Sequence, residues 1–216
     1  MTELTEAWDQ LGELWQLAFA QAWAAYQDGC CPVGALLLDP AGAVVAQARN
    51  RVRASHTRSR ELADTKIAHA ALNALVQIPT ATEHIPTSLY LTFEPCQMCL
   101  GATVLYRIQH VHFGSADFFA GATALTKEPP AIAELGPRIH GPLNNSVCDL
   151  FLHLYIAYHA WQSPAGPIAQ AYALREPAVY SRANSLAELL EPFRISAQTP
   201  LISALHGVSL DILEYS

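Results

Sequence analysis

The first 29 residues carry a helical pattern of apolar and polar positions. Apolar side chains recur every three or four residues, at Leu4, Trp8, Leu11, Trp15, Ala18, Phe19, Ala22, Trp23 and Tyr26. On an α-helix this spacing places them along one stripe, with the polar residues on the opposite side. The pattern therefore predicts one long helix from about Thr5 to Asp28, ended by Gly29.

The next segments show the shorter pattern of β-strands. Two apolar runs, "PVGALLLD" and "AVVAQA", flank the turn residues Asp39-Pro40-Ala41-Gly42, which predicts an antiparallel hairpin. Further along, "SLYLTF" and "QHVHFG" predict two more strands, and "PRIHGPL" predicts a short last one.

Four further segments favour helices. We expect one from about Thr65 to just before Pro79, a second over Cys96–Tyr106 and a third over Asn145–Trp161. Near the C-terminus, Ser185-Leu-Ala-Glu188 has the spacing of a capping box, so a short helix is expected to open there and run through Leu190.

The order of these elements defines a fold class. Strands that alternate with helices in the middle of a chain pair in parallel and are covered by helices on both faces. Together with the antiparallel hairpin this predicts an α/β protein, a three-layer α/β/α sandwich on a mixed five-stranded sheet. "SPAGP" at Ser163–Pro167 is the best boundary. We expect a main domain over residues 1–162 and a C-terminal extension over 163–216, as a lid or a dimer arm.

Charge and hydropathy narrow the function classes. The formal net charge is −7 with only two lysines, which disfavours a nucleic-acid partner. Five of the ten arginines nevertheless lie within Arg49–Arg60; they could hold phosphate, or pair with acids on a solvated loop. The apolar runs are too short to cross a bilayer. The amphipathic, acidic N-terminus is unlike a secretory signal, so we expect a cytoplasmic protein without a membrane partner.

The cysteines and one histidine suggest a metal site. The five cysteines include an adjacent pair and form no disulfide framework. Cys96 and Cys99 are spaced to share a helix face, and His69 lies at the start of the preceding predicted helix. Three such ligands would leave one position on Zn²⁺ open for water, as in catalytic sites. A redox pair and a structural zinc site are the alternatives for the C-x-x-C spacing.

The same residues resemble a known family. "AHAALNAL" and "LYLTFEPCQMCLGATVLYRIQHVHFGSAD" are similar to the H-x-E and P-C-x-x-C motifs of the zinc-dependent nucleobase deaminases. The resemblance runs from about Trp15 to Tyr158 and is strongest to tRNA adenosine deaminases and guanine deaminases. It implies the cytidine deaminase-like fold and a glutamate, not a zinc ligand, that carries protons during catalysis.

Alanine stands where the resemblance implies that glutamate. With Ala71 the chain is expected to bind zinc and substrate but hardly to turn over. Two explanations stay open: a naturally inactive homologue, such as a non-catalytic subunit, or a deliberate replacement of glutamate by alanine. Because the remaining motif residues are intact, we favour the replacement.

The resemblance also implies the substrate contacts. Asn50 would contact the base or sugar, although it also suits a turn; Asp117 would lie near the pocket mouth, or cap the following loop; Cys31 would line the floor. Ala70 and Phe118 complete the expected set. The predicted function is hydrolytic removal of ammonia from a small nucleobase, nucleoside or nucleotide, preferably a purine, by a homodimer. The alternatives are a tRNA adenosine deaminase or an inactive zinc-binding accessory subunit.

Overall fold

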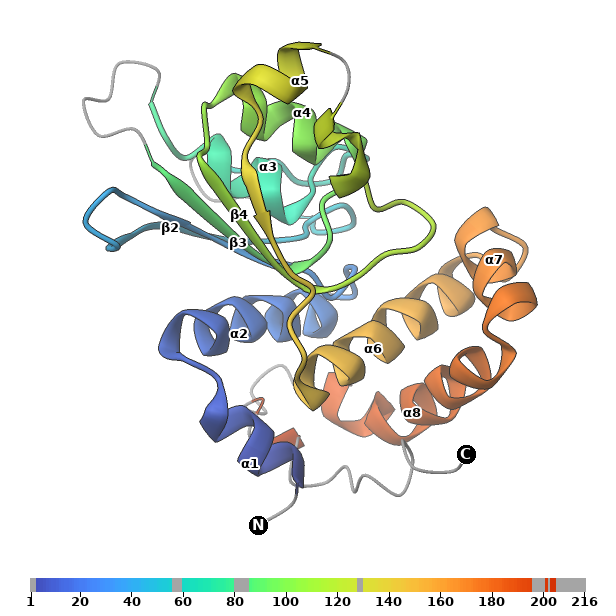
Figure 1. Cartoon of the computed structure of the whole chain (residues 1–216). Coiled ribbons are helices and arrows are strands. Elements are labelled where there is room, and N and C mark those ends of the chain that lie inside the picture. Colours follow the sequence, from blue (N-terminus) through green and yellow to red (C-terminus); the bar gives the residue numbers. More distant parts are fainter. Residues whose placement is uncertain are drawn as a thin grey trace.

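A mixed five-stranded sheet forms the centre of the molecule (Figure 1). The computed structural model describes residues 3–55, 60–79, 86–127, 130–195, 201 and 203–204. The strand order is β2-β1-β3-β4-β5, with β1 antiparallel to β2 and β3, and with β3, β4 and β5 mutually parallel. The strands are β1 (Gly34–Leu38), β2 (Val44–Arg49), β3 (Ser88–Phe93), β4 (His110–Ser115) and β5 (Arg138–His140).

Helices cover both faces of this sheet. On one face lie α3 (Ala70–Leu75), α4 (Gln97–Leu105) and α5 (Pro130–Leu135), and on the other lie α2 (Glu13–Gln27) and α6 (Ser146–Gln162). Beyond α2 and α6, the chain adds α1 (Glu3–Gln10), α7 (Pro167–Arg175) and α8 (Pro177–Ile195), and a 3₁₀ turn spans Thr123–Lys127. The predicted three-layer α/β/α sandwich on a mixed sheet is confirmed, with a fourth partial layer where α8 packs on α6.

The N-terminal helix is broken where one continuous helix was predicted. The break falls between α1 and α2, because Gly12 takes an extended conformation (φ −65°, ψ 156°) and starts α2 as its N-cap. The apolar stripe survives the break, since Leu4 and Trp8 of α1 join Phe19 and Trp23 of α2 in one core cluster. Gly29 follows α2 with a φ of +71°, a conformation that glycine adopts without strain.

Two other predicted helix starts are wrong. The helix expected from Thr65 begins only at Ala70, because His69 is extended (ψ 153°) and serves as the N-cap. The helix expected to open at Ser185 is the middle of α8, which starts at Pro177. The Ser185 hydroxyl donates a hydrogen bond to the Ser181 carbonyl one turn earlier (3.4 Å), as serines inside helices do.

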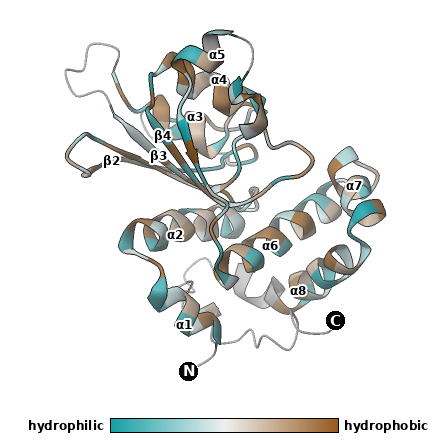
Figure 2. Cartoon of the chain, viewed as in Figure 1, coloured by the Kyte–Doolittle hydropathy of each residue, from teal (hydrophilic) through white to brown (hydrophobic). Residues whose placement is uncertain are grey.

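The core has one layer on each side of the sheet. α1, α2, α6 and α8 share a cluster built around Phe19 and Phe151, whose rings lie 4.8 Å apart. The opposite layer packs α3 and α4 on Leu37, Leu89 and Leu91 of the strands. Figure 2 shows hydrophilic and hydrophobic residues mixed along the helices, as expected of helices with one face in a core. No helix among the described residues has the length and apolar character needed to cross a membrane.

Gly34 sets the distance between α2 and the sheet. A Cβ atom added there would lie 2.1 Å from the Ala18 carbonyl oxygen and 2.7 Å from the Ala22 nitrogen, both backbone atoms of α2. We therefore expect Gly34→Ala to push α2 off β1 and lower the free energy of unfolding by at least about 3 kcal/mol. Urea unfolding measures this. Gly101→Ala is the control: its added Cβ meets nothing within 4 Å, so equal destabilisation would contradict the explanation.

Candidate active site

Three side chains that can bind a metal converge at the ends of two neighbouring helices. The Cys96 and Cys99 sulfurs are 3.6 Å apart, and the His69 Nδ1 atom lies 3.7 Å from the first and 3.6 Å from the second. His69 is the N-cap of α3, Cys96 is the N-cap of α4, and Cys99 lies in the first turn of α4. Because α3 and α4 pack on the same face of the sheet, their N-termini meet beside the carboxyl end of β3.

These separations fit a zinc ion. Zinc–sulfur bonds of about 2.3 Å and zinc–nitrogen bonds of about 2.0–2.1 Å in a tetrahedron place two sulfurs about 3.8 Å apart, and a sulfur and a nitrogen about 3.6 Å apart. The ligand atoms all lie within 4.8 Å of one another. Two soft thiolates and one imidazole are a donor set that zinc prefers. The residues present therefore fit zinc, with one tetrahedral position left for a non-protein ligand.

The electrostatics of the pair favour a thiolate. The hydrogen bond with Cys99, together with a smaller effect of the hydrogen bond with His69, lowers the pKa of Cys96 to about 4 although burial raises it. The same contact raises the pKa of Cys99, which is buried. The N-terminal end of α4 adds a positive backbone potential at both sulfurs. One negative sulfur is thus already favoured without metal, and metal binding would displace the proton of the other.

A cavity of about 270 Å³ opens beside these ligands. The floor and walls come from the sheet and from α3 and α4. The roof comes from α6 and α7, which contribute Tyr155, Tyr158, His159 and Ile168. The remaining lining residues are Cys31, Val33, Asn50, Val52, Lys66, His69, Ala70, Ala71, Leu91, Phe93, Glu94, Pro95, Cys96, Cys99, Asp117 and Ala120.

Two carboxylates line the cavity, and both are occupied by the loop after β4. Glu94 accepts hydrogen bonds from the backbone nitrogens of Asp117 (3.0 Å) and Thr123 (3.1 Å), and from the Thr123 hydroxyl. Asp117 accepts from the Phe119 and Ala120 nitrogens (2.9 and 3.0 Å). Its other oxygen accepts from the Tyr155 hydroxyl at 3.1 Å. These carboxylates hold the loop in place.

Ala71 supplies no proton-carrying group to the cavity. It is the second residue of α3, is 2 % exposed, and lines the cavity together with the three metal ligands. Its methyl group neither accepts nor donates a proton. Among the described residues that line it, the cavity therefore has three metal-binding side chains at one end and no carboxylate beside them that is free of hydrogen bonds.

The roof of the cavity carries a neutral imidazole. Burial, and then the charge of His69, lower the pKa of His159 to about 4, so its ring is uncharged at neutral pH. The His159 Nε2 atom lies 3.9 Å from the Cys31 sulfur, and its ring packs edge-on against Tyr155. A neutral imidazole offers one hydrogen-bond donor and one acceptor. No sequence pattern pointed to His159, because its segment has the pattern of a helix that covers the sheet.

The other predicted contact residues fall into two groups. Cys31, Asn50, Ala70 and Asp117 line the cavity. The Asn50 side chain also accepts a hydrogen bond from the Val52 nitrogen (3.1 Å). Asn50 is therefore both a turn residue and a residue that lines the cavity. Phe118 is not a lining residue: its ring is 43 % exposed and packs edge-on against Tyr172 of α7, 4.3 Å between centroids.

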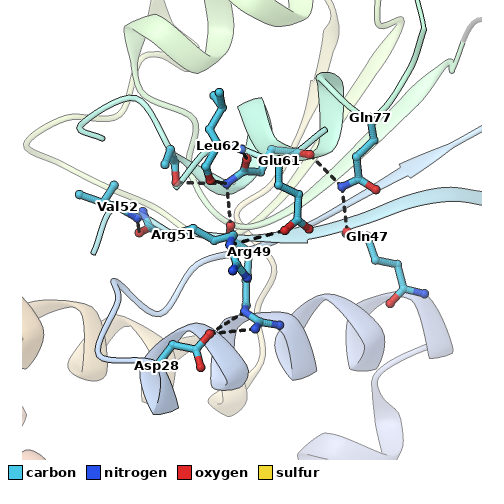
Figure 3. A network of polar contacts seen from close by, with 11 residues as sticks. Asp28, Gln47, Arg49, Arg51, Val52, Glu61, Leu62 and Gln77 are labelled. Carbon is cyan, nitrogen blue, oxygen red and sulfur yellow. Dashed lines mark hydrogen bonds and ion pairs between the residues drawn. The ribbon is translucent and has the colours of Figure 1, made fainter. Parts of the chain in front are cut away.

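Two arginines of the segment Arg49–Arg60 form ion pairs with acidic side chains (Figure 3). Arg49 forms a salt bridge with Asp28 at 2.8 Å. Arg51 lies 3.5 Å from Glu61, and the side chains of Arg51 and Glu61 are largely buried. Arg58 lies outside the described residues. For the two paired arginines, the contacts favour the interpretation of a loop tied to acids over that of a phosphate site.

Asn73 organises the loop that leads to His69, a role that was not predicted from the sequence. It is fully buried, and its side-chain oxygen accepts from the Leu62 nitrogen at 2.6 Å. Its amide nitrogen donates to the carbonyls of Leu62 (3.1 Å), Arg49 (3.3 Å) and Ala68 (3.4 Å). A buried asparagine inside a short helix could have signalled such a role, because buried amides need partners.

We expect Asn73→Leu to lower the free energy of unfolding by about 2–4 kcal/mol and to reduce zinc content, since it leaves buried backbone groups without partners. Urea unfolding and metal analysis measure the two effects. Gln77→Leu is the control, because the half-buried Gln77 donates to the backbone carbonyls of Gln47 (3.1 Å; Figure 3) and Asn73 (2.8 Å), and these bonds involve neither the Asn73 side chain nor the loop before His69. A full zinc load in the Asn73 variant would contradict a positioning role.

Fold and site together define the class of protein. A mixed α/β/α sandwich with a histidine and two cysteines at adjacent helix N-termini, beside a cavity, is a catalytic type of zinc centre. Residues 8–115, half of the chain, match the model of the cytidine and deoxycytidylate deaminase zinc-binding region. The chain therefore belongs to this family of zinc-dependent deaminases, with Zn²⁺ as its cofactor.

Relatives of this chain include enzymes of tRNA modification. It is 37% identical over 94 residues to the tRNA(Ile)-lysidine synthase of Deinococcus deserti, covering 42% of this chain and 16% of the relative. It is 37% identical over 106 residues to the tRNA-specific adenosine deaminase of Bacillus subtilis, covering 46% and 58%. The chain thus spans less than two thirds of either relative.

A solved structure has the same fold. It comes from a study of A-to-I editing by tRNA:A34 deaminases at the wobble position of transfer RNA, with a TM-score of 0.52 and 24% identity. The match covers 64% of this chain and 97% of that one. It extends the agreement in fold beyond the residues of the family match.

Proposed function

We propose that this chain is a zinc-dependent hydrolytic deaminase of a small nucleobase, nucleoside or nucleotide, preferably a purine, in which alanine replaces the proton-carrying glutamate. The enzyme class rests on the family and on the ligand set. The inactive state rests on Ala71, the cavity position at which the resemblance implies glutamate. As written, the chain should hold zinc and substrate with little turnover.

The roof of the cavity is the observation that supports a small substrate. α6 and α7 place Tyr155, Tyr158, His159 and Ile168 over the metal ligands and leave about 270 Å³. Pockets for drug-sized ligands have volumes of roughly 300–1,000 Å³, so this space suits one flat ring system. A free base needs only this space, whereas an RNA loop that delivers a base to it would also have to fit beside the roof.

The residues divide the work of hydrolysis between them. When bound, zinc supplies a Lewis acid that makes water a nucleophile at neutral pH. The aromatic and aliphatic walls exclude bulk water, and Asp117 fixes the loop that closes the cavity through its bond with Tyr155. Asn50 and His159 offer hydrogen bonds to the base edge. A glutamate at position 71 would take a proton from water and deliver it to the ring and the leaving amine.

The tRNA adenosine deaminases are the second candidate. The identity of 37% with the enzyme of Bacillus subtilis favours them, while the roof and the net charge of −7 favour a small substrate. A naturally inactive accessory subunit is the non-enzymatic alternative. We also propose a homodimer, with residues 163–216 serving as a lid or dimer arm.

Binding to the chain as it stands decides between these substrates, because Ala71 keeps ligands intact. We expect calorimetry on the zinc-loaded protein to detect guanine or adenine, or their nucleosides, at least tenfold more tightly than a tRNA anticodon stem-loop. Tighter binding of the stem-loop would overturn the small-molecule assignment. Zinc without affinity for any base, nucleoside, nucleotide or stem-loop would point to a structural metal.

His159 is expected to position the base without holding the metal. His159→Leu keeps the volume of the side chain but removes both hydrogen-bonding nitrogens, so base affinity should fall about 3- to 10-fold at unchanged zinc content. Calorimetry and metal analysis measure the two quantities on the same sample. Trp161→Leu serves as the control, since Trp161 is 59% exposed on the same helix and is not a lining residue of the cavity.

A further inference from the structure

Histidines line up on a part of the sheet that is open to solvent. His110 and His112 of β4 and His140 of β5 share one face with Tyr90 of β3, because side chains two residues apart on a strand point the same way. Tyr90, His112 and His140 are direct partners in the strand register. α2 reaches this face at Trp15, whose ring meets Tyr90 edge-on at 5.2 Å. Beyond that contact His140 is exposed, and His110 and His112 are half-buried.

The rings form an ordered arrangement. Tyr90 and His112 stack at 4.3 Å with planes 10° apart, and His112 and His140 stack at 4.4 Å with planes 14° apart. The His110 Nδ1 atom lies 3.0 Å from the His140 Nε2 atom. The stack thus holds the His140 ring upright, with one nitrogen directed at His110.

We propose that His110 and His140 bind a divalent transition-metal ion with tetragonal geometry, Cu²⁺ in the first place, at a site separate from the zinc centre. Metal–nitrogen bonds of about 2.0–2.1 Å at right angles place two nitrogens about 2.9 Å apart, whereas a tetrahedron places them about 3.4 Å apart. The spacing of 3.0 Å, at which the two rings share a hydrogen bond without metal, is closer to the right-angle value, so the pair would need little movement to bind such an ion. For two neutral rings, metal binding needs both facing nitrogens unprotonated, so the proton between them moves to the other nitrogen of the ring that carries it.

The neighbours of the pair define its limits. His112 lies parallel to His140, so it cannot direct a nitrogen at the same ion and acts as a support. Arg138 is the register partner of His110 and lines the adjoining cavity with Arg107 and Glu134. This local positive charge opposes a cation, so Arg138→Gln should tighten binding.

The site is independent of deamination. His110 opens β4, and the zinc centre lies past the other end of that strand, five residues or roughly 17 Å further along. Copper bound there neither replaces the zinc nor reaches the cavity. The proposed copper site therefore does not depend on the proposed deaminase function.

Copper titration of the zinc-loaded protein tests this. We expect native mass spectrometry to find one Cu²⁺ per chain with zinc retained, and pulsed electron paramagnetic resonance to count two coordinated imidazoles. His110→Ala and His140→Ala should each weaken copper binding at least tenfold and leave at most one imidazole. His112→Phe keeps the stack and should keep both imidazoles, and Gln109→Ala, at an exposed neighbour, should change nothing.

Three results would overturn the proposal. Copper could bind equally to the His110 and His140 variants, it could enter only by displacing zinc, or His112→Phe could cost as much affinity as His140→Ala. Circular dichroism of each variant separates loss of a ligand from loss of the fold. A variant that keeps its far-UV spectrum and thermal midpoint but loses copper supports the assignment.

Discussion

Ala71→Glu is expected to raise the rate of ammonia release at least about 10²–10⁴-fold over the chain as it stands, the range that a positioned general acid–base contributes. Ala71 lines the cavity that the three metal ligands share, so a glutamate there can extend into it. The other lining carboxylates cannot take over, because Glu94 and Asp117 are bonded to the loop after β4. Steady-state assays of ammonia release with bases, nucleosides and nucleotides measure the effect.

Ala71→Gln is the matched control for this experiment. Glutamine has the shape of glutamate but does not carry the proton, so its rate should stay near that of the Ala71 chain. Metal analysis of all three proteins ensures that zinc content is equal. If the Ala71→Glu protein holds zinc yet releases no ammonia from any compound of the panel, the deaminase proposal fails and the accessory-subunit alternative gains support.

Removal of zinc is expected to lower the thermal midpoint by about 8–16 °C. A ligand present at about a thousand times its dissociation constant stabilises the folded state by about 4 kcal/mol, and about 1 kcal/mol shifts the midpoint of a chain of this size by about 2–4 °C. Bound zinc would join the N-termini of α3 and α4, because His69 is the N-cap of α3 and Cys96 is the N-cap of α4. Scanning calorimetry with and without a chelator measures the shift.

Cysteine variants assign the shift to this site. Cys96→Ala should abolish the response to chelator, because it removes one of the three ligands. Cys30→Ala should keep the response, because Cys30 is buried in a separate cluster with Ala25 and Ala54. A chelator effect that persists in the Cys96 variant would place the stabilising metal elsewhere.

The periodicity of apolar residues predicted the strands and the helices that pack on the sheet. It did not predict helix ends that depend on the backbone conformation of one residue, such as Gly12 and His69. The strands were placed by apolar runs, which reflect burial directly. The break at Gly12 was missed because an apolar stripe continues through it. The late start of α3 goes with Asn73, whose side chain is hydrogen-bonded to both backbone groups of Leu62 in the preceding loop. The contact between Asn73 and Leu62 joins residues eleven positions apart, so it produces no periodic pattern in the sequence.

The metal ligands could be predicted because their spacing encodes their geometry. Residues spaced like Cys96 and Cys99 are near each other on any helix. His69 joins them if its helix lies next to theirs on the sheet, as it does. The roof of the cavity could not be predicted, since His159 and Ile168 reach it through the packing of α6 and α7. Phe118 was misplaced for the same reason: Tyr172, from a distant segment, provides the surface on which its ring rests.

The two halves of the cavity have separate origins in the chain. The zinc ligands lie within residues 8–115, the part shared with the family, whereas Tyr155, Tyr158, His159 and Ile168 lie beyond it. The metal ligands and the expected base contact Asn50 therefore lie in the family stretch, whereas the roof over the cavity lies outside it. If the proposed function holds, we expect a graft of residues 146–175 onto another member of the family to change which substrates it accepts and to leave its zinc ligands in place.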